Sequence, residues 1–298
     1  MTPNPLLKKL GFLETDRAVI LHTDDIGMCH ASLQAFKDLW QFGTITSAAV
    51  MVPCPWFPAV AQICRATPDM DMGVHATLNA EWESYRWGPL STRDQASGLL
   101  DSDGYFHQWH QAVYDNAKPE AVEKEVNAQI ERALAAGIDV THVDSHMGTI
   151  MSPLFIQAYI QAAATRLLPS MLPRMDAQGM EMVGMSATEM QAYEPILQQL
   201  EKIGVPMLDG ILSMPLDEPS GEKQMQLAKD LLGSLPVGIS HFVLHPSIDT
   251  AELRAIAPDW ESRVANYNTF MSDELKEFIA SEDIKPIGYR QIRNAMRN

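Results

Sequence analysis

Short apolar runs alternate with longer amphipathic segments along almost the whole chain. The runs have the length and composition of buried strands, and they predict strands at 19–23, 47–52, 72–78, 140–144, 207–213, 242–245 and 286–288. The amphipathic segments predict helices at 31–42, 57–66, 119–136, 153–168, 187–203, 222–235 and 273–281. Strands that alternate with helices in this way indicate a parallel sheet with helical crossovers.

The number of these strand–helix units favours a closed barrel. Seven or eight units in 298 residues suit a TIM-like (β/α) barrel, and we expect one domain spanning residues 1–298. A doubly wound open sheet is the alternative. No Gly-x-Gly-x-x-Gly turn follows the first run, however, so the usual dinucleotide signature of that fold is missing.

Residues 79–118, after the third predicted strand, interrupt the alternation. This segment holds three of the six tryptophans, Trp82, Trp87 and Trp109, together with Tyr85 and Tyr105. A loop of this length within a compact domain is usually functional or disordered. Since aromatic residues are scarce in disordered segments, we interpret 79–118 as an aromatic-rich insertion that forms a lid or wall over the ends of the early strands.

Composition and charge exclude several classes of function. The net charge of −16, from 22 basic and 38 acidic residues, argues against binding to nucleic acid or to an anionic membrane surface, because both need basic patches. No apolar run approaches the ~18 residues of a membrane span. The first ten residues lack the apolar core of a secretory signal, and the three cysteines form no Cys-x-x-Cys pair. We therefore expect a cytoplasmic protein, with a homodimer as the base-rate oligomer.

The first apolar run ends in two adjacent carboxylates, Asp24 and Asp25. Two acids at the exit of a buried strand are costly unless a cation or a proton-transfer role compensates them. The exits of parallel strands are also where α/β enzymes place their chemistry. The plain structural alternative is that Asp25 caps the helix predicted from residue 31.

Histidines occupy the ends of three other predicted strands. His75 lies in an apolar strand, where a single histidine is more often a hydrogen-bonded core residue than a ligand. In His142-Val-Asp-Ser-His146, three titratable groups spaced by two share one strand face. In His241-Phe-Val-Leu-His245 the two histidines also share a face. We expect structural roles for the two that lie deeper in their strands, His142 and His241.

The position of these clusters predicts a shared site. The carboxyl ends of parallel strands meet on one face of a barrel. A carboxylate and two imidazoles there form an oxygen-and-nitrogen metal set with open positions for water and a substrate oxygen, as metal-assisted hydrolysis requires. A remaining carboxylate would serve as general base and a remaining histidine as general acid.

In these motifs the chain resembles the YdjC-like carbohydrate deacetylases, a family of N-deacetylases related to the polysaccharide deacetylases. The resemblance spans residues 17–293 and includes the C-terminal stretch from Ala257 to Gly288. Four motifs that occur in the family's order carry it: Thr23-Asp-Asp-Ile-Gly27, Gly73-Val-His-Ala-Thr-Leu78, His142-Val-Asp-Ser-His146 and Leu244-His-Pro246.

The resemblance implies a distorted barrel and a single divalent metal. It implies that Asp25, His75 and His146 are the metal ligands and that Asp24 is the base that activates the water. His245 would be the general acid for the amine leaving group.

The resemblance also bears on substrate contacts. It implies that Arg263 orients a carboxylate or the substrate. Members commonly have a histidine two residues after the third-motif ligand, where this chain has Gly148. The aromatic side chains of Trp82, Tyr85 and Trp87 would either stack on a sugar ring or anchor the lid to the barrel.

We therefore expect a metal-dependent hydrolase that removes an acetyl group from an N-acetylated sugar, a small-molecule carbohydrate. Zinc suits the ligands best, and magnesium or another divalent ion is the alternative. Two other functions stay open: a different single-metal barrel hydrolase acting on a non-sugar amide or a phosphoester, and a non-catalytic carbohydrate-binding protein. A phosphatase would more often need a two-metal site.

Overall fold

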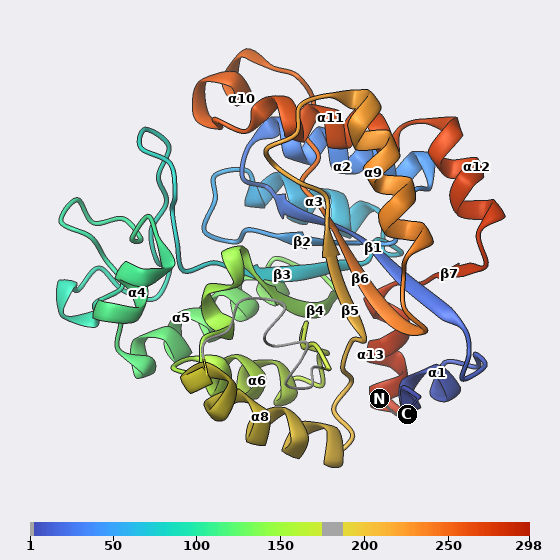
Figure 1. Cartoon of the computed structure of the whole chain (residues 1–298). Helices are drawn as coiled ribbons and strands as arrows, with labels where there is room; N and C mark the ends of the chain where they lie inside the picture. The colour runs from blue at the N-terminus through green and yellow to red at the C-terminus, as the bar shows by residue number, and fades with distance from the viewer. Residues whose placement is uncertain (1–2, 175–186) are drawn as a thin grey trace.

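Parallel strands surrounded by helices form the centre of the molecule (Figure 1). The computed structural model describes residues 3–174 and 187–298. The strands are β1 (Arg17–Ile26), β2 (Ser47–Val50), β3 (Met72–Ala76), β4 (Val140–Ser145), β5 (Gly210–Ser213), β6 (Gly238–Leu244) and β7 (Ile284–Pro286). They pair in the order β4-β3-β2-β1-β6-β5, β7 pairs with the start of β1, and every pairing is parallel, which confirms the predicted α/β fold.

An irregular segment at 169–174 joins the two outer strands of this sheet. The backbone N–H of Met171 donates to the carbonyl of Val143 in β4 at 3.0 Å. On the other side, the N–H of Leu208 donates to the carbonyl of Leu172 at 2.8 Å, two residues before β5 begins. The sheet therefore closes on itself through single bridges and forms the distorted barrel that was expected.

Helices cover both sides of the strands, with α2, α3 and α11 above them and α5, α6 and α8 below in the view of Figure 1. No described helix is both long and apolar enough to cross a membrane. In the described residues the helices are α1 (Pro5–Lys9), α2 (His30–Phe42), α3 (Phe57–Ala66), α4 (His110–Asn116), α5 (Pro119–Ala135), α6 (Ile156–Ala164), α8 (Ala187–Lys202), α9 (Gly221–Gly233), α10 (Ala251–Ile256), α11 (Trp260–Phe270), α12 (Asp273–Ser281) and α13 (Tyr289–Arg297), with 3-10 turns η1 (Gln95–Ser97) and η2 (His146–Met151).

The largest differences from the predicted elements occur where polar side chains are buried. β6 begins at Gly238, four residues before the predicted start at 242. The prediction began too late because Ser240 and His241 interrupt the apolar pattern, although both are fully buried. Helix α11 was not predicted, and neither were α1, α4, α10 and α13. The buried face of α11 includes Ser262, Arg263 and other polar residues, so no apolar stripe marks it in the sequence.

The segment 79–118 lies between β3 and α5 and extends to the left of the strands in Figure 1. Several of its aromatic side chains belong to the main hydrophobic core. The indole N–H of Trp87 donates to the carbonyl of Asn79 at 2.6 Å, and Trp82, Trp87 and Phe106 are buried. This packing holds the segment beside the end of β3, where the neighbouring strands also end.

Candidate metal centre

The adjacent acids Asp24 and Asp25 lie near the end of β1, where an irregularity in the strand turns both side chains toward His75. The pairing of β1 with β2 shifts register between Thr23 and Ile26, and Asp25 has a φ of 62°, which is uncommon for a residue other than glycine. In a regular strand, neighbouring side chains point to opposite faces. Here Asp24 Oδ2 and Asp25 Oδ1 lie 3.8 and 3.5 Å from Nε2 of His75. The N-cap of α2 is Cys29, so the alternative of Asp25 as a helix cap is wrong.

Three side chains from separate segments of the chain form a compact donor set. Asp25 Oδ1 lies 3.2 Å from Nδ1 of His146 and 3.5 Å from Nε2 of His75, and one ligand atom from each residue lies within 4.8 Å of the others. All three side chains are buried, and Asp25 Oδ1 has no hydrogen-bond partner. An orphaned carboxylate oxygen beside two imidazole nitrogens fits a divalent metal ion.

A carboxylate lies behind each of these two imidazoles. His75 Nδ1 is 2.8 Å from Oδ1 of Asp144, and His146 Nε2 is 2.9 Å from Oε2 of Glu81. Such partners fix the ring orientation and the tautomer of histidine ligands in metalloproteins. Each ring therefore turns its other nitrogen toward Asp25.

Arg263 forms an ion pair with the second oxygen of Asp25. Its Nη1 donates to Asp25 Oδ2 at 2.7 Å and its Nε donates to Asp259 at 2.9 Å, while the guanidinium lies over the ring of Trp82. Burial opposes ionisation of Asp25, but the charge of Arg263 outweighs it and holds the pKa of that carboxyl well below its usual range. The structure thus places Arg263 on the proposed ligand Asp25.

Asp24 and His245 lie together beside the donor set. Asp24 Oδ2 is 3.7 Å from Nε2 of His245 and 3.8 Å from Nε2 of His75, whereas Asp24 Oδ1 is 3.1 Å from Nε2 of His22. Burial lowers the pKa of His245 below its ordinary value. In the metal-free protein at neutral pH, this imidazole is therefore predominantly neutral and able to accept a proton.

A cleft of about 730 Å³ opens onto this group. Asp25, His146, His245 and Arg263 line it, whereas Asp24 and His75 lie outside its lining. Its lining includes Glu81, Trp82, Trp109, Met147, Leu216, Ile256 and Pro258.

The predicted aromatic contacts divide between this cleft and the core. Trp82 lines the cleft. Trp87 is 3% exposed and, like Tyr85, lies outside the lining; the Tyr85 hydroxyl donates to the carbonyl of Met28 at 2.5 Å. Trp109 is 59% exposed in the cleft.

Gly148, where the resembling family commonly has histidine, lies in η2 directly after the third motif. It has a φ of +69°, and a Cβ built on it would meet no atom within 4 Å. The position thus has space for a side chain but a backbone conformation that favours glycine.

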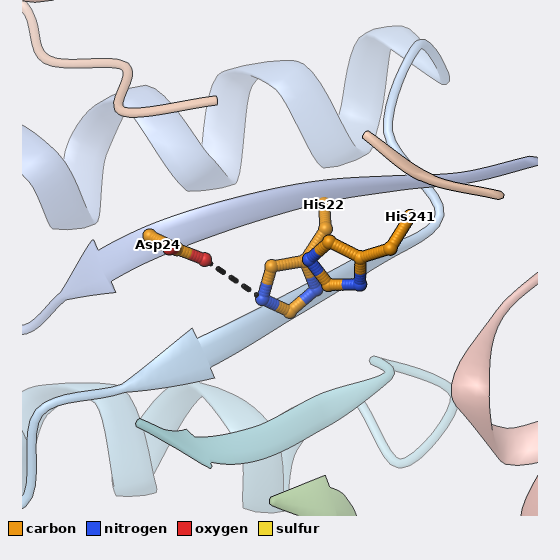
Figure 2. Close-up of side chains that lie close together, drawn as sticks. All are labelled: His22, Asp24 and His241. Carbon is orange, nitrogen blue, oxygen red and sulfur yellow. Dashed lines mark ion pairs between the residues drawn. The ribbon is translucent and has the colours of Figure 1, made fainter. Parts of the chain in front are cut away.

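Three more histidines are buried in the barrel interior beneath this group. Figure 2 shows His22 of β1 next to His241 of β6, with the carboxylate of Asp24 pointing at His22. His142 stacks on Tyr289 with ring centroids 3.8 Å apart, and the hydroxyl of Tyr289 is 2.8 Å from His241 Nδ1. His142 and His241 thus contact Tyr289 in the interior, and each also belongs to a group of side chains that could hold a metal ion.

Sequence reasoning missed Glu81, Trp109 and His22 as site residues. His22 had a signal: it stands two residues before Asp24, and side chains spaced by two share a strand face. Glu81 and Trp109 had no such signal beyond their place in the insertion, because a loop has no periodicity from which the direction of a side chain can be inferred.

Comparison with known proteins identifies relatives along nearly the full length of the chain. Residues 18–281 match the family described as YdjC-like protein. The carbohydrate deacetylase of Thermus thermophilus is 31% identical over 295 residues, which cover 98% of this chain and 99% of that protein. The carbohydrate deacetylase of Thermoanaerobacter pseudethanolicus is 24% identical over 271 residues, covering 91% and 97%.

A solved structure shares the fold. It comes from Enterococcus faecalis V583 and is described as a candidate cellobiose-phosphate cleavage protein. It matches with a TM-score of 0.74 and 23% identity, over 93% of this chain and 99% of its own.

Proposed function

Because this chain belongs to the YdjC-like family, we propose that it is a carbohydrate deacetylase, a metal-dependent hydrolase that removes an acetyl group from the nitrogen of an N-acetylated sugar. One observation carries the proposal: the two acids both approach Nε2 of His75 but differ in their other neighbour. Asp25 Oδ1 lies 3.2 Å from Nδ1 of His146, whereas Asp24 Oδ2 lies 3.7 Å from Nε2 of His245. This arrangement supports a metal site at the cleft, with a proposed acid in the cleft lining and a proposed base next to it.

Asp25, His75 and His146 would hold the ion. When bound, a divalent ion supplies Lewis-acid chemistry, polarising the amide carbonyl and lowering the pKa of water. One carboxylate and two imidazoles suit zinc best, and magnesium or another divalent ion is the alternative.

Asp24 and His245 would move the proton. Oδ2 of Asp24 would accept the proton of the attacking water, since its other oxygen, Oδ1, lies 3.1 Å from Nε2 of the buried His22. His245 Nε2, 3.7 Å from Asp24 Oδ2, then receives this proton and delivers it to the nitrogen of the departing amine.

We also propose that segment 79–118 forms the wall of the cleft that faces the substrate, and that residues 1–298 form a single domain. Glu81, Trp82 and Trp109 from this segment line the cleft above the candidate metal centre. A flat indole face with one exposed side suits the apolar face of a sugar ring.

Trp109→Ala should raise KM about tenfold and leave kcat within about twofold. Stacking on a ring remote from the reacting amide contributes binding in ground and transition states alike, and tenfold corresponds to about 1.4 kcal/mol. Steady-state kinetics of acetate release measure both constants. Tyr105→Ala is the matched control, because Tyr105 lies in the same segment but outside the cleft. An unchanged KM in Trp109→Ala would remove this residue from the binding surface.

Glu81→Gln should weaken metal binding by about 10- to 100-fold, the usual cost of removing a carboxylate partner from a ligand histidine. The variant keeps the side-chain shape next to His146 Nε2 but loses the charge. Calorimetric titration with zinc measures the dissociation constant. Glu83→Gln, another acid of the cleft wall, should bind zinc like the unmodified protein. Equal affinities in the two variants would contradict the role of Glu81.

Metal affinity should rise steeply with pH from 6 to 8. Burial disfavours the imidazolium form of His146, but Glu81 and Asp25 outweigh this and raise its pKa to about 9 in the metal-free protein. A ligand nitrogen must be neutral, so each bound ion displaces at least one proton, and affinity should increase by about tenfold per pH unit or more. Calorimetry in buffers of different ionisation heats counts the released protons. Proton-independent binding would contradict the ligand role of His146.

The decisive experiment is to purify the protein, determine its bound metal and assay acetate release from N-acetylated mono- and oligosaccharides. We expect release that a chelator abolishes and that the added metal restores. O-acetylated sugars separate amide from ester cleavage, and phosphate release from sugar phosphates tests the phosphoester alternative. Sugar binding without turnover in the metal-loaded protein would instead favour a carbohydrate-binding protein.

A further inference from the structure

A continuous series of buried polar side chains runs beneath the candidate metal centre. His75 Nδ1 lies 2.8 Å from Asp144 Oδ1, and Asp144 Oδ2 lies 3.0 Å from Nε2 of His22. The same Nε2 lies 3.1 Å from Asp24 Oδ1, the ion pair drawn in Figure 2. His22 is fully buried, and Asp144 is 1% exposed.

The position of His22 is unusual because one nitrogen atom faces two carboxylates. Burying two carboxylates so close together is costly without a compensating charge or donor. Burial disfavours a charged His22, but Asp144 and Asp24 outweigh it and raise the pKa of this imidazole to about 9. The positive charge of His22 therefore compensates the two acids and allows them to lie close together.

Each carboxylate keeps one oxygen on His22 and presents the other to the site. Asp24 directs Oδ2 at His245 and at Nε2 of His75. Asp144 directs Oδ1 at Nδ1 of His75. The ring of His22 thus contacts two carboxylates that have different proposed roles. Asp24 is the proposed base, and Asp144 orients the proposed ligand His75.

We propose that His22 is a positioning residue that couples the base to the metal site. It holds Asp24 so that Oδ2 is free for the proton, and it holds Asp144 so that His75 turns Nε2 toward the ion. This inference rests on the proposed function. It gives His22 a distinct signature, because its loss should affect kcat and metal affinity together, whereas a change in Asp24 should affect kcat alone.

The surroundings of His22 raise one competing interpretation. Its ring lies 4.6 Å from that of His241, centroid to centroid, and ligand atoms of His22, Asp24 and His241 lie within 4.8 Å of one another. Nε2 of His241 has no hydrogen-bond partner. The same side chains could therefore hold a second ion, and the experiment must separate the two interpretations by counting metal.

The test uses two substitutions of His22 in the full chain. His22→Leu removes the nitrogen at similar volume, and His22→Gln retains a donor. In His22→Leu, kcat should fall at least about tenfold and the zinc dissociation constant should rise at least about fivefold, with KM nearly unchanged. His22→Gln should recover part of both losses. Tyr289→Phe, which removes only the hydroxyl beside His241 in the same interior, is the matched control and should stay within about twofold.

The outcomes are distinguishable from one another. A folded His22→Leu protein with normal kcat and normal zinc affinity overturns the proposal, as does a loss of thermal stability alone. Two ions per unmodified chain, with one lost in His241→Leu, overturn it in favour of a second metal site. If the unmodified protein releases no acetate, the proposed function fails, while zinc titration of the His22 variants still tests the support of His75.

Discussion

Asp24→Asn should abolish most turnover while the protein still binds its metal. We expect kcat to fall by about 10²- to 10⁴-fold, the usual contribution of a positioned general base. An amide has nearly the shape of the carboxylate but cannot accept a proton at neutral pH. Acetate release measured by stopped assay, with metal content determined on the same sample, checks both halves of the result.

The geometry explains why the two effects should separate. Asp24 is not part of the group formed by Asp25, His75 and His146, although with His75 and Asp144 it forms another group that could hold an ion, and the metal content of the variant distinguishes the two. Its Oδ1 contacts His22, and the amide of an asparagine preserves the size of that contact. Near-normal turnover in metal-loaded Asp24→Asn would show that another group takes the proton. Loss of metal would instead make Asp24 a ligand.

The second large effect should come from the ligands themselves. The Asp25→Ala, His75→Ala, His146→Ala triple variant should retain no metal after dialysis and show no acetate release above background. No protein oxygen or nitrogen of the proposed set then remains to replace water around the ion. Elemental analysis measures metal retention. His110→Ala, at an exposed histidine outside the cleft, is the control and should stay fully loaded.

A folding defect must be separated from a loss of ligands in that variant. Removing Asp25 leaves the buried guanidinium of Arg263 with Asp259 as its remaining ion-pair partner, which destabilises the protein. Asp25→Asn keeps the side-chain volume and should already weaken zinc binding strongly. Circular dichroism of the triple variant and of Asp25→Asn measures whether each protein is folded. Stoichiometric metal in a folded triple variant would contradict the ligand assignment.

Much of the architecture could be predicted because it depends on local pattern. A run of apolar residues predicts a buried strand wherever it occurs, and the helices at 57–66 and 273–281 coincide with α3 and α12. The failures are equally physical. Helix α11 buries polar side chains, and β6 carries His241 into the barrel interior, so in both elements some buried positions give no hydrophobic signal.

The sequence by itself determined the candidate chemistry: two adjacent acids and three histidines at the ends of separate strands, in an order that resembles one family. Only the tertiary structure decided where the two carboxylates point. The irregularity after Thr23 and the positive φ of Asp25 turn both carboxylates toward His75, against the alternation of a regular strand. It also decided that Glu81 supports His146 and that His22 joins Asp24 to Asp144. Such contacts join residues far apart in the chain, and no local pattern carries information about them.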